Sequence, residues 1–161
     1  MIRPAVPADV PVLLALVREL AVYEREPDAV EATEQDLAAA LFGADPAAAC
    51  SVALLDGAVV GFALWYRTFS TWTGRPGLWL EDLYVRPEAR GTGLGKALLV
   101  ELAQTTVRNG WTRFEWWVLD WNTPAHGFYR SLGAQPEDDW TVWRVAGDAL
   151  TTLAAPLPSQ T

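Results

Sequence analysis

The fold is decided by the stretch Leu80-Glu81-Asp82-Leu83-Tyr84-Val85, followed by Arg90-Gly91-Thr92-Gly93-Leu94-Gly95. The first part belongs to a predicted strand over 78–85, and helical periodicity follows the second part over 96–108. The first turn of a helix has free backbone N–H groups and the positive end of the helix dipole, and glycines let a phosphate approach them. The glycine-rich turn is therefore a candidate cradle for a pyrophosphate.

Two common phosphate-binding loops do not fit this turn. A dinucleotide fold requires G-x-G-x-x-G, whereas the glycines here stand at 91, 93 and 95. A nucleotide P-loop requires G-x-x-x-x-G-K-[ST]; Gly95-Lys96 fits its end, but Arg90 and Ala97 break the pattern. From the turn alone, a glycine-rich connector that binds no ligand remains the alternative.

The remaining sequence predicts an α/β or α+β domain, with hairpins near its start and a crossover helix in the middle. Asp56-Gly57 between two apolar runs signals a two-residue hairpin, and Thr33 with Asp36 has the pattern of a capping box. We expect strands at 2–5, 51–55, 58–66, 78–85, 111–119 and 140–145, helices at 9–24, 33–43, 96–108 and 123–131, and a loop at 68–77.

Composition limits the function classes. The chain has 161 residues, of which 51% are hydrophobic, and a net charge of −8. It is expected to form one domain over 1–161 with a loose tail at 156–161. The acidic balance does not favour nucleic acid, and the absence of a long apolar run does not favour a membrane span. A cytoplasmic location is the default expectation. The single Cys50 and the single His126 predict no disulfide and no metal site.

Two motifs together resemble the GNAT superfamily of N-acetyltransferases. The strand, the Arg-x-x-Gly-x-Gly turn and its helix resemble the acetyl-CoA-binding core of that family. The later segment Trp121-Asn122-Thr123-Pro124-Ala125-His126-Gly127-Phe128-Tyr129-Arg130-Ser131-Leu132-Gly133-Ala134 resembles its second motif. The resemblance implies a mixed, mostly antiparallel sheet flanked by helices, with acetyl-CoA as cosubstrate. It implies that acetyl-CoA is bound by Leu83, Tyr84, Val85, Arg90, Gly91, Thr92, Gly93, Leu94, Gly95, Lys96, Asn122, Ala125, Tyr129 and Arg130.

Further stretches resemble the diamine (spermidine/spermine) acetyltransferases and their thialysine-acetylating relatives, from residue 2 to residue 145. They are Ile2-Arg3-Pro4-Ala5, Glu19-Leu20-Ala21-Val22-Tyr23-Glu24, Gly61-Phe62-Ala63-Leu64-Trp65-Tyr66, Trp72-Thr73-Gly74 and Leu80-Glu81-Asp82. The sequence departs from that pattern at Ser70, where those enzymes carry an acidic residue, and between Ala134 and Trp140, where it is shorter. We expect these differences to weaken long polyamines as substrates.

The reaction requires a base and an acid. An alkyl amine has a pKa near 10.4, so deprotonating it at pH 7 before it attacks the thioester costs about 4 kcal/mol. The resemblance implies that Glu81 relays this proton, directly or through water, and that Tyr129 is the acid beside the leaving thiolate. The alternatives are a surface or ion-paired strand residue for Glu81 and a packed aromatic for Tyr129. By strand alternation, Glu81 and Asp82 face opposite sides unless a bulge intervenes.

Carboxylates and aromatic faces suit a cationic substrate, to which an aromatic face contributes roughly 0.5–2 kcal/mol. The candidate substrate-binding residues are Tyr23, Glu24, Trp72, Glu81, Asp82, Trp116, Trp117 and Asp138. The expected substrate is a diamine, polyamine or lysine-like amino acid. Another amine, such as an amino acid, an aminoglycoside or a protein N-terminus, and a catalytically silent acetyl-CoA-binding protein are the alternatives. The resemblance and the nine tryptophans also predict a homodimer.

Overall fold

A computed structural model describes residues 1–155, and the expected loose tail at 156–161 lies outside the described residues. The chain divides into two compact units, Met1–Trp117 and a second that begins at Val118, and each is described by itself. One acetyltransferase domain over the whole chain therefore stays a prediction.

The first unit is built on a sheet of five strands in the order β1-β2-β3-β4-β5. The strands are β1 (Ile2–Pro4), β2 (Ala49–Leu55), β3 (Ala58–Ser70), β4 (Arg75–Val85) and β5 (Phe114–Trp116). The first four pair antiparallel, and β5 pairs parallel to β4. The expected mixed, mostly antiparallel sheet flanked by helices is confirmed.

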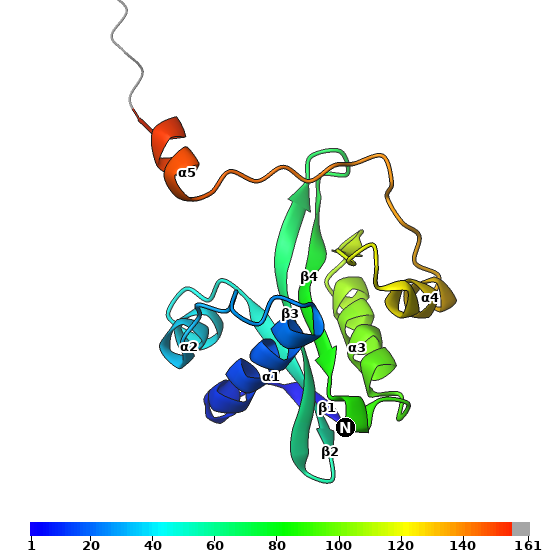
Figure 1. Cartoon of the computed structure of the whole chain (residues 1–161). Coiled ribbons are helices and arrows are strands. Elements are labelled where there is room, and N and C mark those ends of the chain that lie inside the picture. The colour runs from blue at the N-terminus through cyan, green and yellow to red at the C-terminus, as the bar shows by residue number, and fades with distance from the viewer. Residues whose placement is uncertain (156–161) are drawn as a thin grey trace, which may run out of the picture. The chain divides into compact units, whose positions relative to one another are not determined.

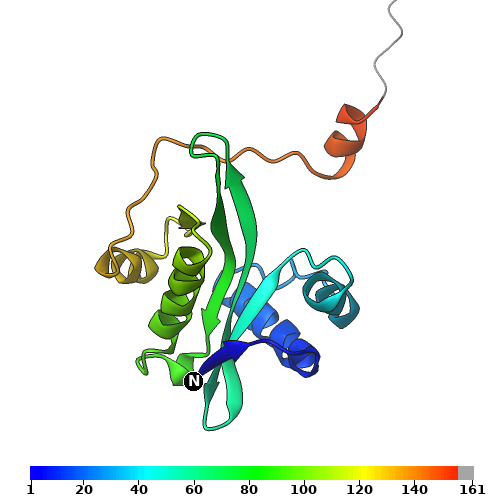
Figure 2. The ribbon, with the colours of Figure 1, turned by 180° about the vertical axis from the view of Figure 1, so that it is seen from behind.

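Helices cover both faces of this sheet (Figures 1 and 2). Helices α1 (Val10–Tyr23) and α2 (Glu34–Phe42) lie on one side, and α3 (Leu94–Arg108) lies on the other. We call these sides the α1 face and the α3 face. A core on the α1 face joins α1 to the strands through Leu13, Leu16, Phe62 and Tyr84. Because Leu16 and Phe62 are fully buried, this core fixes α1 against the middle of β3 and β4.

Local signals in the sequence are confirmed where they act over a few residues. Thr33 accepts a hydrogen bond from the backbone N–H of Asp36, and the Asp36 carboxylate accepts one from the backbone N–H of Thr33. This capping box begins α2 as expected. Asp56 and Gly57 have positive φ angles of 50° and 82°, which joins β2 to β3 by a tight turn.

The hairpin of β3 and β4 is longer than expected. The prediction of a loop over 68–77 is wrong, because Thr68 pairs with Gly77, Phe69 with Pro76 and Ser70 with Arg75. Only residues 71–74 form the turn, and Gly74 closes it with a backbone hydrogen bond to Ser70. Polar residues with Gly and Pro resemble a loop in sequence, but cross-strand partners hold them in a ladder.

The second unit contains two helices, α4 (Thr123–Ser131) and α5 (Gly147–Leu153). The helix expected at 123–131 is confirmed, with Asn122 at its N-cap position. The strand predicted at 140–145 is wrong, because no strand forms there, and α5 is not predicted by the sequence. A run of alternating aromatic residues becomes a strand only when a neighbouring strand pairs with it, and no neighbouring strand of the described chain does so.

Candidate active site

A β-bulge in β4 positions the central carboxylates. Trp65 of β3 lies opposite Leu80, but the next residue back, Leu64, lies opposite Asp82, so Glu81 is the extra residue. An extra residue reverses the alternation of all side chains beyond it. Asp82 and Tyr84 therefore share the α1 face with Trp79, whereas uninterrupted alternation along 78–85 would have placed them with Leu78 and Leu80. The sequence allowed Glu81 and Asp82 to lie on the same face of the sheet only if a bulge intervened, and the structure contains that bulge.

Three carboxylates lie close enough together to influence one another. Asp82 is half-buried, and burial, followed by the negative charges of Glu81 and Glu24, raises its pKa to about 6. Glu24 follows the last residue of α1, and burial raises its pKa as well. Because burial and like charges both disfavour the ionised forms, a bound cation would relieve the repulsion. The structure thus brings the predicted substrate residues Glu24, Glu81 and Asp82 to one region of the α1 face.

The Arg90 guanidinium connects the glycine turn to the end of α1. It lies 5.0 Å from the ring centre of Tyr23 and 5.7 Å from that of Tyr84. Its Nε donates a hydrogen bond of 2.9 Å to the backbone oxygen of Val85. Nearby, Arg86 makes a two-pronged ion pair with Glu19 of α1, in which Nη2 and Oε1 are 2.8 Å apart. These contacts fix Tyr23 beside the start of the turn.

The glycine turn has the backbone shape of a phosphate cradle. Gly91 and Gly93 have φ angles of 78° and 84°, and a Cβ at either position would meet no other atom within 4 Å. The space above the backbone is therefore open, and Gly93 is the N-cap of α3. Leu94, Gly95 and Lys96 form the first turn of α3, whose N–H groups have no partner within a helix. This open backbone fits the pyrophosphate of a coenzyme.

The turn is held by its own polar groups. The Thr92 hydroxyl donates a hydrogen bond of 2.6 Å to the backbone oxygen of Ala89, and this bond holds the start of the turn in place. Leu83 and Val85, two of the residues predicted to bind acetyl-CoA, lie on β4 just before the turn.

The three tryptophans predicted to bind the substrate lie in different parts of the first unit. Trp117 contacts Trp79 edge to face at 4.9 Å between ring centres, close to the carboxylates. Trp116 pairs with Leu80 on the α3 face and contacts Phe114, so the structure does not bring it to Glu81. Trp72 lies in the hairpin turn and is 87% exposed.

The other predicted residues belong to the second unit. Asn122 precedes α4, and its backbone oxygen accepts from the N–H of Ala125 at 3.0 Å. Tyr129 and Arg130 lie in the last turns of α4, where the ring of Tyr129 is 5.3 Å from that of Phe128. Asp138 is exposed and lies between α4 and α5. Their roles beside Glu81 stay predictions.

Sequence reasoning missed two neighbours of Glu81. The indole Nε1 of Trp79 donates a hydrogen bond of 3.1 Å to Glu81 Oε2. Tyr66 lies directly opposite Trp79 on β3. Burial, then the charge of Glu81 and a hydrogen bond to it, raises the pKa of Tyr66. Counting outward from the hairpin turn would have paired these two aromatics, but that turn was not recognisable inside the expected loop.

Other features do not contribute chemistry at this site. Cys50 is buried, and burial together with the charges of Asp9 and Asp82 raises its pKa to about 12, so its thiol stays protonated. Residues 1–155 contain no group of three or more histidines, cysteines or carboxylates arranged to hold a metal ion. No helix among these same residues is long and apolar enough to cross a membrane.

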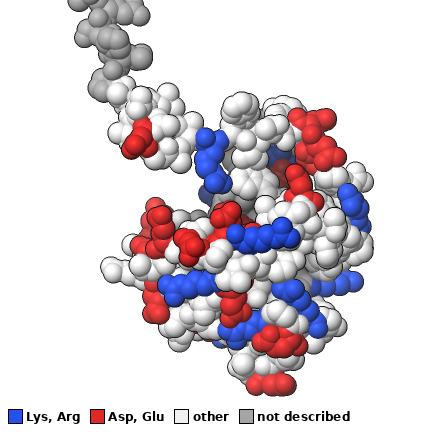
Figure 3. All heavy atoms as spheres, viewed as in Figure 1, with Lys and Arg blue, Asp and Glu red and all other residues white. Residues whose placement is uncertain are grey.

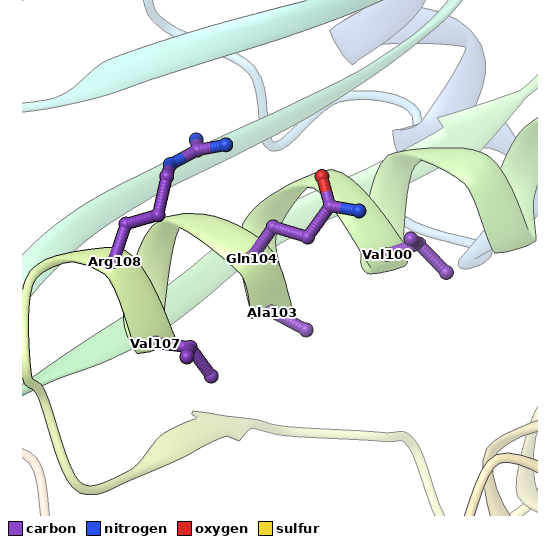
Figure 4. A pocket seen from close by; sticks show the side chains of 5 residues that line it. All are labelled: Val100, Ala103, Gln104, Val107 and Arg108. Carbon is purple, nitrogen blue, oxygen red and sulfur yellow. The ribbon is translucent and has the colours of Figure 1, made fainter.

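Two further features of the surface lie outside the predicted site. An apolar hollow of about 470 Å³ lies on α3, lined by Val100, Ala103, Gln104, Val107 and Arg108 (Figure 4). None of these residues is among the predicted site residues. Acidic and basic side chains are interspersed over the visible face, with no broad basic area gathered on it (Figure 3).

The chain is similar to known acetyltransferases over most of its length. The profile of the acetyltransferase (GNAT) family matches residues 14–134. A thialysine N-epsilon-acetyltransferase from Bos taurus is 39% identical, with 96% of each chain covered. An L-ornithine N5-acetyltransferase from Arabidopsis thaliana is 31% identical, with 94% of this chain and 86% of that protein covered.

Solved structures share the fold. An integron cassette protein from Vibrio cholerae superposes with a TM-score of 0.81 at 28% identity, covering 97% of this chain and 98% of that chain. An aminoglycoside acetyltransferase in complex with sisomicin superposes with a TM-score of 0.75, covering 91% of this chain and 95% of that chain. Because it is only 20% identical, that likeness concerns the fold alone.

Proposed function

Because the chain belongs to the acetyltransferase (GNAT) family, we propose that it transfers the acetyl group of acetyl-CoA to the primary amine of a small dicationic substrate. That the protein is an acetyltransferase follows from its family and its relatives. The preferred substrates are lysine-like amino acids and short diamines, with spermine lower. The full-length relatives support this class, since their names specify thialysine and ornithine.

One observation carries the substrate proposal. The bulge puts Glu81 and Asp82 on the α1 face, where Glu24 from the end of α1 adds a third carboxylate to the field. None of the three forms an ion pair within the described residues. A second positive charge on the substrate would lie near Glu24 or Asp82 while the reacting amine lies near Glu81. An arginine-lined or apolar site would not favour such a substrate.

The proposed chemistry needs one proton removed and one supplied. When bound, acetyl-CoA supplies the activated thioester, and the open backbone of the glycine turn would hold its pyrophosphate. Glu81 accepts the proton of the ammonium group, directly or through water, so that the free amine attacks the carbonyl carbon. The Tyr129 hydroxyl donates a hydrogen bond or a proton to the departing sulfur, whose pKa of about 8.5 resembles that of cysteine.

The deciding experiment measures release of free thiol from acetyl-CoA with a panel of amines. The panel contains thialysine, lysine, ornithine, 1,3-diaminopropane, spermidine, spermine, butylamine and an aminoglycoside. We expect the highest kcat/KM with the lysine-like and short diamine compounds. Turnover confined to aminoglycosides, aromatic amines or a peptide N-terminus would replace this substrate class. Binding of acetyl-CoA without turnover of any amine would indicate a silent binding protein.

The variant Glu24→Gln tests whether the site recognises the second positive charge of the substrate independently of the reacting amine. Glu24→Gln should raise KM for a dicationic substrate roughly 5- to 10-fold, in line with the loss of one partly exposed charge contact of about 1 kcal/mol. It should barely change KM for butylamine, which has no second charge. Glu26→Gln, on an exposed residue of the following turn, is the control. Equal effects on both substrates would remove Glu24 from the site.

A further inference from the structure

Two neutral aromatic side chains with polar hydrogens lie beside Glu81: one on its own strand β4 and one on the neighbouring strand β3. Trp79 precedes it by two residues on β4 and donates its indole N–H to Glu81 Oε2 at 3.1 Å. Tyr66 occupies the position opposite Trp79 on β3, so its side chain extends from the same face of the sheet. The phenol keeps its proton at neutral pH, because burial and the nearby carboxylate raise its pKa, and a protonated phenol can donate.

The bulge explains why such support is needed. Glu81 is the extra residue at the register shift, and a bulged residue has no partner directly opposite on the neighbouring strand. Its side chain is also exposed, so packing alone leaves several rotamers open. The indole N–H of Trp79 bonds to the carboxylate in one of these rotamers, and the phenol of Tyr66 extends from the same face of the sheet. Trp117 in turn packs edge to face on Trp79, with ring centres 4.9 Å apart, and limits rotation of the indole.

We propose that Trp79 and Tyr66 are positioning residues for acetyl transfer, which hold the Glu81 carboxylate on the α1 face in the orientation that receives the amine proton. This inference rests on the proposed role of Glu81 as proton acceptor and adds two residues to which the family resemblance assigned no role. Both donors are neutral, so they orient the carboxylate without cancelling the charge that attracts the substrate. A lysine or arginine at either position would orient Glu81 but would also compete with the ammonium group.

The test removes each donor while keeping its ring. Trp79→Phe deletes the indole N–H, and Tyr66→Phe deletes the phenolic O–H. Each should lower kcat about 10-fold or more with a lysine-like or diamine substrate, since small misplacement of a catalytic group has effects of up to about 100-fold. The KM for acetyl-CoA should stay unchanged. Trp79→Tyr, which keeps a polar hydrogen at the ring edge, should retain more activity than Trp79→Phe.

The chain offers a matched control. Trp65 is adjacent to Tyr66 on β3 but extends from the α3 face, and its buried indole N–H has no hydrogen-bond partner within the described chain. Trp65→Phe therefore removes an N–H from a tryptophan of the same hairpin without touching Glu81. It should leave kcat nearly unchanged, while melting temperatures for all variants show how much each substitution costs in stability.

Repeating both substitutions in a Glu81→Gln variant distinguishes an effect through Glu81 from an effect on packing. In Glu81→Gln, neither Trp79→Phe nor Tyr66→Phe should lower kcat further, because the group that they orient is gone. An equal loss in both backgrounds would mean that the aromatics act through packing, and would overturn the proposal. So would a loss in Trp79→Phe and Tyr66→Phe no larger than in Trp65→Phe. If Glu81→Gln itself keeps full kcat, the proposed role of Glu81 fails, and this inference fails with it.

Discussion

At the scale of single residues, the ionised carboxylate of Asp82 is expected to lower the stability of the folded protein while it attracts a cationic substrate. Its pKa is about 6 in the folded protein against an ordinary value of 3.8, so the folded state binds the proton more tightly than the unfolded state. On account of this group, the free energy of unfolding falls as the pH rises from about 4 to about 6. Above about pH 6, the ionised Asp82 lowers the free energy of unfolding by roughly 1–3 kcal/mol.

Asp82→Asn should therefore stabilise the free enzyme at pH 7 and raise KM for the amine. Urea unfolding at pH 7 should give a larger free energy of unfolding for the variant, and the gain should shrink toward zero near pH 4. A variant that is less stable than the parent at pH 7 would show that Asp82 is held by a partner rather than strained. Unchanged amine KM would remove Asp82 from the substrate site.

The proposed acid is a residue of the second unit. Tyr129→Phe keeps the ring that contacts Phe128 and removes only the hydroxyl. General acid–base groups contribute typically about 100- to 10,000-fold, so kcat should fall within that range while the Kd for acetyl-CoA stays near normal. Steady-state kinetics and calorimetry with acetyl-CoA measure the two quantities. A kcat equal to that of the parent would leave Tyr129 with a packing role.

At the scale of elements, the glycine turn predicts which ligand stabilises the fold. A ligand that binds only the folded state raises the melting temperature by mass action. Acetyl-CoA should do so here, and adenine dinucleotides should not, because the spacing of Gly91, Gly93 and Gly95 is not that of a dinucleotide loop. Stabilisation by NAD(P) but not by CoA would contradict the assignment of the turn.

A matched pair of glycines separates strain from ligand contact. Gly93 and Gly57 have φ angles of 84° and 82°, and a Cβ at either meets nothing within 4 Å. Alanine at either should therefore destabilise the fold by a similar amount, about 1–2 kcal/mol. Only Gly93→Ala should also weaken acetyl-CoA, because its methyl group would stand where the pyrophosphate approaches. Equal acetyl-CoA affinity in the two variants would place the coenzyme elsewhere.

Elements also show where sequence reasoning succeeds and fails. The capping box at Thr33 and the turn at Asp56-Gly57 were predictable because each depends on contacts within four residues. The glycine turn is also a local signal, and the role of Glu81, which the family resemblance implies, stays a prediction. The sequence indicated that a bulge was needed to bring Glu81 and Asp82 to one face, but it did not predict the bulge, which depends on how β3 pairs with β4. The pairing of Tyr66 with Trp79, and the absence of a strand over 140–145 within the described residues, depend equally on distant parts of the chain.

At the scale of the whole molecule, we predict a homodimer. The described chain exposes large aromatic side chains, among them Trp72 at 87% and Trp143 at 91%. Aromatic residues are enriched at protein interfaces, and the diamine acetyltransferases that the sequence resembles support the same expectation. Light scattering at micromolar concentration should give twice the chain mass of 17.7 kDa. The mass of a single chain would contradict the prediction.

The bulge at Glu81 makes the length of β4 as important as its composition. Before it, odd-numbered residues such as Trp79 belong to the α1 face, and after it even-numbered residues such as Asp82 do. Deleting a residue of β4 on either side of Glu81 would remove the bulge and turn the residues between the deletion and Glu81 to the opposite face, whereas deleting Glu81 itself would leave the other residues on their present faces. Trp79 would change face after a deletion between the hairpin turn and Trp79, and the buried Tyr84 after a deletion at Val85. Insertions and deletions in this strand should therefore be tolerated far less than substitutions, in any library that samples both.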